Sequence, residues 1–309
     1  MQFFSSSDTE AIKDVEEIRI FLEENNIEYS TEYDNFCIWY GNPDGKRSYE
    51  ITYVSSKDFP IAYPSYGIDG VAKDFFFKIS HKAEIEDNSF RLWIKDFEWR
   101  NPRQKEVLKS YILHAANKTP YGFYARDCEV QLVESKRARE FELENCFYGK
   151  RGASLNLGLY LKKDKNGLKK GDLLMIYTFG KNFFAKKDGI VEVIRVGTRK
   201  FCHVAGGSSK LFTHFLNNYK VLQLGERTMK VEQIKFYSDY DHNLGGSMEG
   251  IGFQFAGYSK GGFMNYWIEE NKAKQREPMK HKWIMEQMSL GKVLAIPNAG
   301  IKNFILDIE

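Results

Sequence analysis

The sequence predicts an α/β protein of the α+β kind, built from two domains. Its 309 residues suit two domains of about 100 to 200 residues each, and 42% hydrophobic content is typical of a globular chain. Strand-like runs rich in β-branched and aromatic residues are mixed with helix-like segments whose apolar residues recur every three or four positions. A helix end followed by Pro120 marks the boundary, so we expect domains at 1–120 and 121–309.

The first domain is predicted to hold a helix, a hairpin, a strand and a second helix. Ser7 or Asp8 can cap a helix that runs to about Asn25, and the spacing of Ile12, Val15, Ile18 and Leu22 predicts that they form its packing face. Residues 36–54 predict a hairpin, because a turn sequence separates two β-rich runs. A buried strand over 91–94 and a helix over 103–116 follow.

The second domain is predicted to begin strand, helix, strand, strand, strand. These elements are expected at 129–133, 134–145, 155–161, 172–179 and 191–196. A helix over 209–219 and a strand over 236–239 come next. The tail is predicted to form a basic helix, which carries Lys272, Lys274, Arg276, Lys280, His281 and Lys282, and then a hairpin around Pro297.

The loop before helix 209–219 is a candidate phosphate site, formed by Gly206, Gly207, Ser208, Ser209 and Lys210. A small-residue loop that opens a helix leaves free backbone N–H groups at the positive end of the helix dipole. Serine hydroxyls can cap the helix or donate to phosphate oxygens, and Lys210 adds a cation. An ordinary capped helix after a glycine turn explains the same residues.

Charge is unevenly distributed along the chain. Residues 1–100 hold 11 basic and 20 acidic residues of the 45 and 42 in the whole chain, so they carry −9 and residues 101–309 carry +12. A basic C-terminal part with nearby aromatics can attract nucleic acid, so DNA is the expected partner, although such faces are often merely solvated.

Four well-separated cysteines without zinc spacing predict reduced thiols. Because no apolar run approaches membrane-span length and the start lacks a signal-peptide pattern, we expect a cytoplasmic protein without membrane insertion.

A second candidate site is a metal-dependent nuclease centre in the first domain. Hydrolysis of a phosphodiester with Mg²⁺ needs at least two acids that converge on the ion. Glu50 and Asp69 are the candidate metal ligands, with Asp74 and Asp96 as further acids and His81 as a possible base. Each of these acids alone is more often a surface or turn residue.

Several segments in order resemble a known family. They are Asp96–Trp99, Tyr124–Val130, Phe141 with Asn145, Tyr177–Gly180 and Gly206–Leu211. They resemble phage-encoded homing-type endonuclease relatives, in which a domain similar to very-short-patch repair endonucleases precedes a GNAT-like acyltransferase module of the Mom type. Asp69-Gly70 stands where that family has an Asp-Gly turn, but the histidine expected after it is absent, so the nuclease-like domain is expected to be degenerate.

The resemblance implies that the loop Gly206 to Lys210 holds the pyrophosphate of acyl-coenzyme A. It also places Asp239, Asp241 and His242 on a loop that faces the cofactor, where a carboxylate can act as a base or bind a cation. An Asx-type turn explains the same residues. Arg195 is the fourth catalytic candidate, as an anion contact or a buried ion-pair partner.

Where acetyltransferases commonly carry an acidic tyrosine, this chain has Met248, which cannot donate a proton. Tyr237, Tyr240 or His242 would have to replace that tyrosine.

Three functions therefore remain open. The first is a DNA-associated enzyme of phage type that binds an acyl-CoA-like donor and modifies DNA or another amine. The second is a homing-type, Mg²⁺-dependent DNA endonuclease. The third is a DNA-binding or partner-binding protein without catalytic activity.

Overall fold

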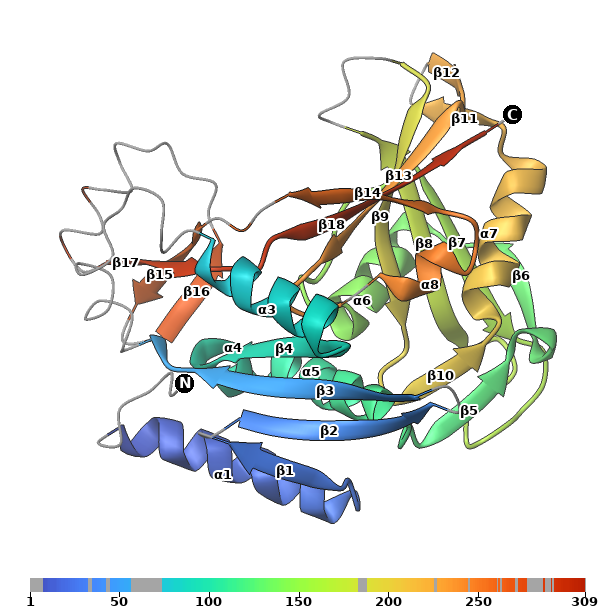
Figure 1. Ribbon diagram of the computed structural model, residues 1–309. Coiled ribbons are helices and arrows are strands. Elements are labelled where there is room, and N and C mark those ends of the chain that lie inside the picture. Colours follow the sequence, from blue (N-terminus) through green and yellow to red (C-terminus); the bar gives the residue numbers. More distant parts are fainter. Residues whose placement is uncertain are drawn as a thin grey trace. The chain divides into compact units, whose positions relative to one another are not determined.

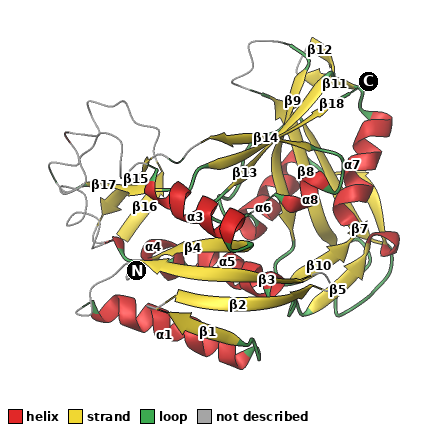
Figure 2. Cartoon of the chain, in the orientation of Figure 1, coloured by secondary structure: helices red, strands yellow, loops and turns green. Residues whose placement is uncertain are grey.

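The chain is a mixed α/β protein, as predicted (Figures 1 and 2). The computed structural model describes residues 8–32, 35–42, 45–56, 74–182, 188–224, 227–243, 245–259, 261, 263–269, 272–276, 286, 290 and 292–308. These residues divide into two compact units, neither of which is one continuous stretch. Unit 1 comprises 1–105, 239–244 and 258–301, and unit 2 comprises 106–238, 245–257 and 302–309. The chain therefore first passes between units near Lys105 rather than near residue 120, and it returns to unit 1 twice.

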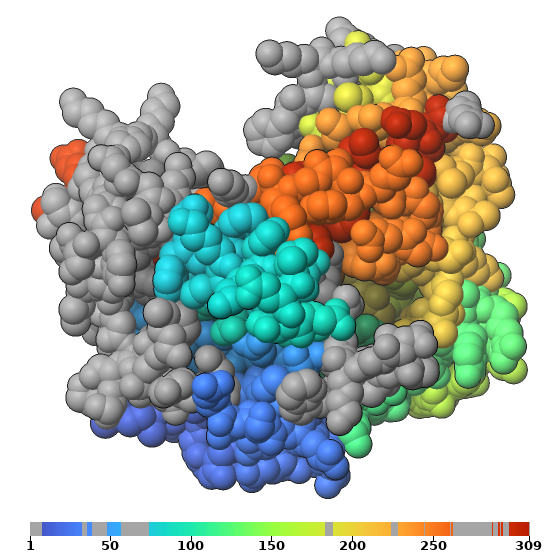
Figure 3. All heavy atoms as spheres, in the orientation of Figure 1, coloured from blue at the N-terminus to red at the C-terminus, as the bar shows by residue number. Residues whose placement is uncertain are grey.

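Unit 1 contains a four-stranded sheet in the order β1-β2-β3-β4. Its strands are β1 (Tyr29–Glu32), β2 (Asn35–Asn42), β3 (Gly45–Val54) and β4 (Ser89–Lys95). The predicted hairpin is confirmed, because β2 and β3 pair antiparallel from Asn35↔Thr52 to Asn42↔Gly45. Strand β4 lies parallel to β3, which requires the crossover that α3 (Phe75–Glu86) supplies. Figure 3 shows α3 at the surface on the drawn face.

The predicted first helix is confirmed as α1 (Thr9–Glu24), with the Asp8 carboxylate accepting a hydrogen bond from the Ala11 N–H at 3.2 Å. Its buried face agrees with the expected one at Ile18 and Leu22 but not at Ile12. Asp14 and Ile18 are buried, whereas Ile12 is 46% exposed.

The end of β4 leads directly into two helices, α4 (Asp96–Arg100) and α5 (Pro102–Ala115). The Glu98 carboxylate accepts a hydrogen bond from the Lys95 backbone N–H at 3.0 Å, which fixes the first turn of α4. Trp93 of β4 is fully buried and stacks on Phe76 of α3, with ring centroids 3.9 Å apart. These contacts form much of the interior of unit 1.

Unit 2 is built on a seven-stranded sheet in the order β14-β18-β13-β9-β8-β7-β6. Its strands are β6 (Cys128–Leu132), β7 (Leu155–Leu161), β8 (Leu173–Lys181), β9 (Ile190–Thr198), β13 (Gln233–Asp239), β14 (Gln254–Ser259) and β18 (Ile301–Asp307). The predicted strand-helix-strand-strand-strand order is confirmed as β6, α6 (Ser135–Asn145), β7, β8 and β9. Strands β6 to β9 pair antiparallel, whereas β13 runs parallel to β9.

Helix α7 (Gly207–Asn218) packs on one face of this sheet over β6 and β7, and side chains of β8 also contact it. Phe215 stacks on Phe179 with ring centroids 4.0 Å apart. At the start of the helix, an added Cβ on Gly207 would lie 2.9 Å from the sulfur of Met175, so a larger residue here would require that side chain to move. The smaller elements are β5 (Tyr121–Tyr124) parallel to β10 (Cys202–Ala205), the pair β11 (Val221–Leu224) and β12 (Arg227–Lys230), and α8 (Gly246–Glu249).

The tail differs from both predictions made for it. Residues 272–276 form strand β16 (Lys272–Arg276), paired with β15 (Phe263–Glu269), so the basic helix expected to begin there was wrong for this part. Residues 280–282 lie outside the described residues. The expected hairpin is also absent from the described segment, because β17 (Val293–Pro297) pairs with β15 while β18 joins the seven-stranded sheet. The turn after Pro297 connects two different sheets.

Candidate functional site

The predicted phosphate loop is a helix start rather than a loop, because Gly207 to Lys210 already form the first turn of α7. Gly206 has φ +72°, a left-handed conformation that glycine adopts without strain, and helix α7 begins at the next residue. Within the described part of the chain, no side chain caps this helix start, so the first N–H groups of α7 have no side-chain acceptor there. Ser209 is exposed and Ser208 is partly buried. The segment thus keeps the backbone features of an anion site.

The side chain of Lys210 makes two contacts with the backbone. Its ammonium donates hydrogen bonds to the carbonyl oxygens of Ala125 and Cys128 at 2.9 and 2.7 Å. Two of its three donors are therefore engaged by the backbone of unit 2. Lys210 fixes the segment before β6 onto α7.

The parallel strands β9 and β13 pair over only four residues, from Gln233↔Ile190 to Phe236↔Val193. Beyond this point β9 continues to Thr198 and β13 to Asp239 without pairing to each other. The physical reason lies on the other side of β9, where Thr178 pairs with Arg195 but Phe179 pairs with Val193. Ile194 is the extra residue of a β-bulge, and bulges bend a strand and increase its local twist.

Arg195, a predicted catalytic residue, follows this bulge. Its guanidinium donates to the carbonyl oxygen of Ile194 at 2.9 Å and to that of Gly149 at 3.3 Å. Arg195 thus satisfies a carbonyl at the point where the β9–β13 pairing has ended.

The other three predicted catalytic residues lie together in unit 1, within a buried charged network. The Lys95 ammonium donates to the Asp241 carboxylate at 2.7 Å, and the two side chains are 1% and 0% exposed. The second Asp241 oxygen accepts from the Ala299 N–H at 2.6 Å. Glu98 lies 3.6 Å from the same ammonium. The sequence analysis identified Asp241 as a candidate residue but did not identify its partner Lys95.

His242 joins this network through both ring nitrogens. Nδ1 lies 2.5 Å from the Asp239 carboxylate, and Nε2 lies 3.7 Å from that of Glu98. Burial alone would lower the pKa of His242, but the two carboxylates outweigh it and raise the pKa to about 9. The imidazole is therefore positively charged at neutral pH. Burial also raises the pKa of Asp241, against the opposing effect of Lys95.

The nuclease candidates do not converge among the residues that the structure describes. Glu50 forms an ion pair with Arg91 and accepts a hydrogen bond from the Ser89 hydroxyl at 3.0 Å. Asp69 lies outside the described residues. Within the described ranges, no group of three or more His, Cys, Asp or Glu side chains could hold a metal ion. The carboxylate of Glu50 is engaged by an arginine instead.

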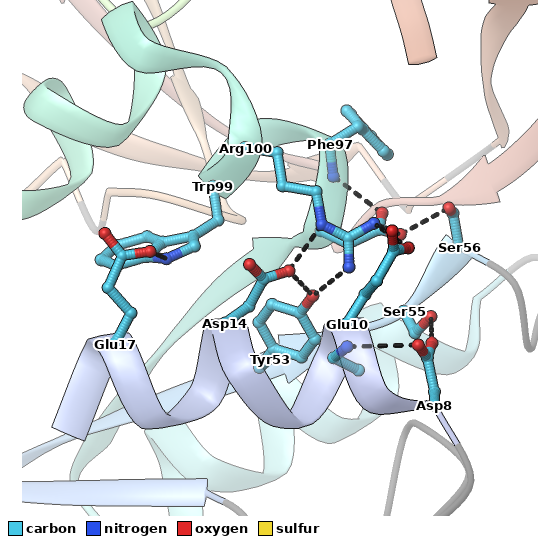
Figure 4. A network of polar contacts seen from close by, with 12 residues as sticks. Asp8, Glu10, Asp14, Glu17, Tyr53, Ser55, Ser56, Phe97, Trp99 and Arg100 are labelled. Atoms are coloured by element: carbon cyan, nitrogen blue, oxygen red, sulfur yellow. Dashed lines mark hydrogen bonds and ion pairs between the residues drawn. The ribbon is translucent and has the colours of Figure 1, made fainter. Parts of the chain in front are cut away.

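Asp96, a further nuclease candidate, belongs to a separate polar network that the sequence did not reveal (Figure 4). Arg100 donates to the Asp14 carboxylate at 2.6 Å and lies 3.5 Å from Asp96. Tyr53 donates to the same Asp14 oxygen at 2.6 Å, and Ser56 donates to Asp96 at 2.7 Å. This network ties α1 and α4 to the end of β3, which explains why Asp14 is buried.

No protein-family model matches the chain, and no curated protein matches it. None of the described helices combines the length and hydropathy needed to span a bilayer.

Proposed function

We propose that unit 2 is a GNAT-like module that binds an acyl-CoA-like donor and transfers its acyl group to an amine of DNA or another acceptor. The observation that carries this proposal is the end of pairing between β9 and β13 at the Ile194 bulge. Ligands of α/β proteins characteristically bind beyond the carboxyl ends of parallel strands. The diverging halves of β9 and β13 are such ends.

The N-terminus of α7 is the proposed binding site for the phosphate groups of the donor. Helix α7 follows β9 and β10 along the chain, and its first N–H groups have no side-chain cap. Uncapped N–H groups at a helix N-terminus attract phosphate through both hydrogen bonding and the helix dipole. The element order β6, α6, β7, β8, β9, α7 and β13 agrees with the order expected for a GNAT-like fold.

The transfer itself needs an acid for the departing sulfur. The acceptor nitrogen forms a bond to the thioester carbonyl carbon, the C–S bond breaks, the thiolate takes a proton, and the acceptor nitrogen loses one. Met248 is 1% exposed within the core of unit 2 and has no proton to give. Tyr240 donates to Glu84, and His242 is held by Asp239 and Glu98. We therefore assign the acid role to Tyr237.

Tyr237 is the first residue of β13 beyond its last pair with β9. Its oxygen accepts a hydrogen bond from the Asn182 amide at 2.9 Å, which leaves the phenolic proton available for donation. Asp239, Asp241 and His242 then have a structural role in unit 1. Tyr237→Phe should lower kcat with little change in donor affinity, because it removes a proton but not a binding surface.

Calorimetric titration with acetyl-coenzyme A and coenzyme A tests donor binding. Ser209→Glu places a negative charge on the exposed first turn of α7 and should weaken binding at least tenfold by repelling phosphate. Thr213→Glu adds the same charge one turn later and is the matched control. Lys210→Glu is unsuitable, since it would also break two backbone hydrogen bonds. Absence of binding by the wild-type protein would refute the proposal.

DNA is proposed as a partner on a different observation, the surface around β5. The Tyr124 ring is 52% exposed and lies between two cations, with Arg126 at 4.7 Å and Lys165 at 5.4 Å from its centroid. The cation-rich loop 162–170 is held beside β5 by a hydrogen bond from Asn166 to the Gly122 carbonyl. An exposed aromatic among cations suits stacking on a base beside a phosphate backbone.

Fluorescence anisotropy with labelled single-stranded and duplex DNA over a salt series tests this partner. Arg126→Ala should reduce the slope of log K against log salt by about one, as expected for one lost phosphate contact. Tyr124→Ala should weaken single-stranded binding more than duplex binding, because only unpaired bases can stack on the ring. Lys82→Ala, which removes an exposed cation of unit 1, is the control. Equal effects of all three changes would refute this surface.

A further inference from the structure

The hydroxyl of Tyr177 is a buried donor that makes no hydrogen bond to any residue that the structure describes. Tyr177 is 0% exposed and lies in the middle of β8, in the core of unit 2. A buried hydroxyl without a partner destabilises the fold, and phenylalanine would fill the same space without that cost. The hydroxyl therefore calls for an explanation.

Tyr177 lies under the first turn of α7. On β8, Met175, Tyr177 and Phe179 alternate onto the face that this helix covers. Met175 approaches Gly207 at the start of the helix, and Phe179 stacks on Phe215 two turns later. Because Tyr177 lies between Met175 and Phe179 along β8, its side chain lies between these two contacts with α7.

The pKa of Tyr177 agrees with this position. Burial raises it to about 12, and the nearby Ser208 hydroxyl partly opposes the rise. Ser208 is the second residue of α7. The tyrosine thus remains protonated at neutral pH and can act only as a hydroxyl, beside the uncapped helix start.

Tyr177 also lies beside the diverging part of the sheet. Its partner across the β8–β9 ladder is Val196, which follows the Ile194 bulge and lies beyond the residues of β9 that pair with β13. Three independent features therefore meet in unit 2, namely an uncapped helix start, a strand released from its neighbour and a buried donor without an acceptor.

We infer that Tyr177 and Ser208 form the inner wall of the phosphate-recognising site at the start of α7. The Tyr177 hydroxyl donates a hydrogen bond to an oxygen of the bound pyrophosphate, either directly or through the Ser208 hydroxyl. This inference rests on the proposed donor-binding function and deepens it. The outer part of the site consists of the N–H groups of Gly207, Ser208 and Ser209, which point toward the same end of the helix.

Tyr177→Phe distinguishes a ligand-binding hydroxyl from a structural one. Loss of a ligand-binding hydroxyl should weaken coenzyme A binding without lowering the melting temperature, whereas loss of a structural hydroxyl should lower the melting temperature. The free variant should melt at the same temperature as the wild-type protein or higher, since an unsatisfied hydroxyl is removed. Its affinity for coenzyme A, measured by calorimetry, should fall about tenfold, as expected when one ligand oxygen loses its donor. Ser208→Ala should weaken binding in the same direction.

Tyr160→Phe is the matched control. Tyr160 is 5% exposed on β7 of the same sheet, in a cluster with Val133, Phe141 and Ile176 rather than under α7. Tyr160→Phe also removes one hydroxyl, but it should leave the affinity for coenzyme A unchanged.

The outcomes distinguish the inference from the function on which it rests. If the wild-type protein binds coenzyme A and Tyr177→Phe binds it equally well, the inference is wrong and the proposed function stands. A lower melting temperature for free Tyr177→Phe would also overturn the inference, because the hydroxyl would then have a structural partner. If the wild-type protein binds neither coenzyme A nor acetyl-coenzyme A, both fail.

Discussion

Replacing Lys95 by methionine should destabilise the protein strongly. Methionine nearly preserves the length and volume of the side chain, so the change removes the ammonium rather than the packing. Among the described residues, the Ala299 N–H at 2.6 Å would then be the one remaining donor to the Asp241 side chain, which is 0% exposed. Breaking one partner of a buried ion pair costs about 3–5 kcal/mol, because the remaining charge stays uncompensated. We expect a loss of that size in urea unfolding followed by circular dichroism.

A double-mutant cycle isolates the charge effect. Asp241→Asn retains an acceptor for Ala299 but removes the negative charge, so Lys95→Met with Asp241→Asn should lose clearly less stability than the two single losses combined. Lys82→Met, the same substitution on the exposed side of α3, should leave stability unchanged. A loss below about 1 kcal/mol for Lys95→Met, or additive losses in the cycle, would contradict a structural role for this pair.

Two further predictions concern other parts of the chain. The pKa of His242 is raised from 6.5 to about 9, so its charge stabilises the fold fully below pH 6.5 and this contribution disappears as the pH rises through 9. The stability difference between wild-type and His242→Gln in urea should therefore shrink by roughly 3 kcal/mol between pH 6 and pH 10, and a constant difference would contradict the charged imidazole. Gly245→Ala should lower thermal stability by about 2–4 kcal/mol, because φ is +73° and the new Cβ would lie 2.5 Å from the Phe304 ring. Gly246→Ala, with open space around its Cβ, is the control, and equal melting temperatures for the two variants would refute the clash.

Local signals predicted the elements that local chemistry determines. The cap at Asp8, the turn between β2 and β3 and the long apolar runs of β7 and β8 are all visible in the sequence, and all four elements formed. Helix α4 was missed because its start depends on Glu98 bonding back to Lys95, within a segment that otherwise continues a strand pattern. Ile12 was expected inside because apolar spacing cannot foresee that Asp14 is buried by Arg100, 86 residues later.

The candidate sites depended more on long-range contacts. The glycines at 206 and 207 indicated a nearby helix start, but the helix begins at Gly207, two residues before the expected position 209, and only Gly206 adopts the left-handed conformation that favours glycine. The partner of Asp241 lies 146 residues away, and the partner of Glu50 lies on another strand. The bulge at Ile194 arises from strand register and leaves no mark in composition. Sequence patterns thus located charged residues of interest but could not tell which were already neutralised.

The discontinuous course of unit 1 has a consequence during synthesis. A nascent chain that has left the ribosome as far as residue 120 contains Lys95 and Glu98 but neither Asp241 nor Ala299. The Lys95 ammonium stays solvated until the segment with Asp241 has been synthesised. Unit 1 therefore cannot complete its interior before most of unit 2 has been made. Expression of residues 1–120 alone would therefore yield an incomplete fold rather than a free-standing module.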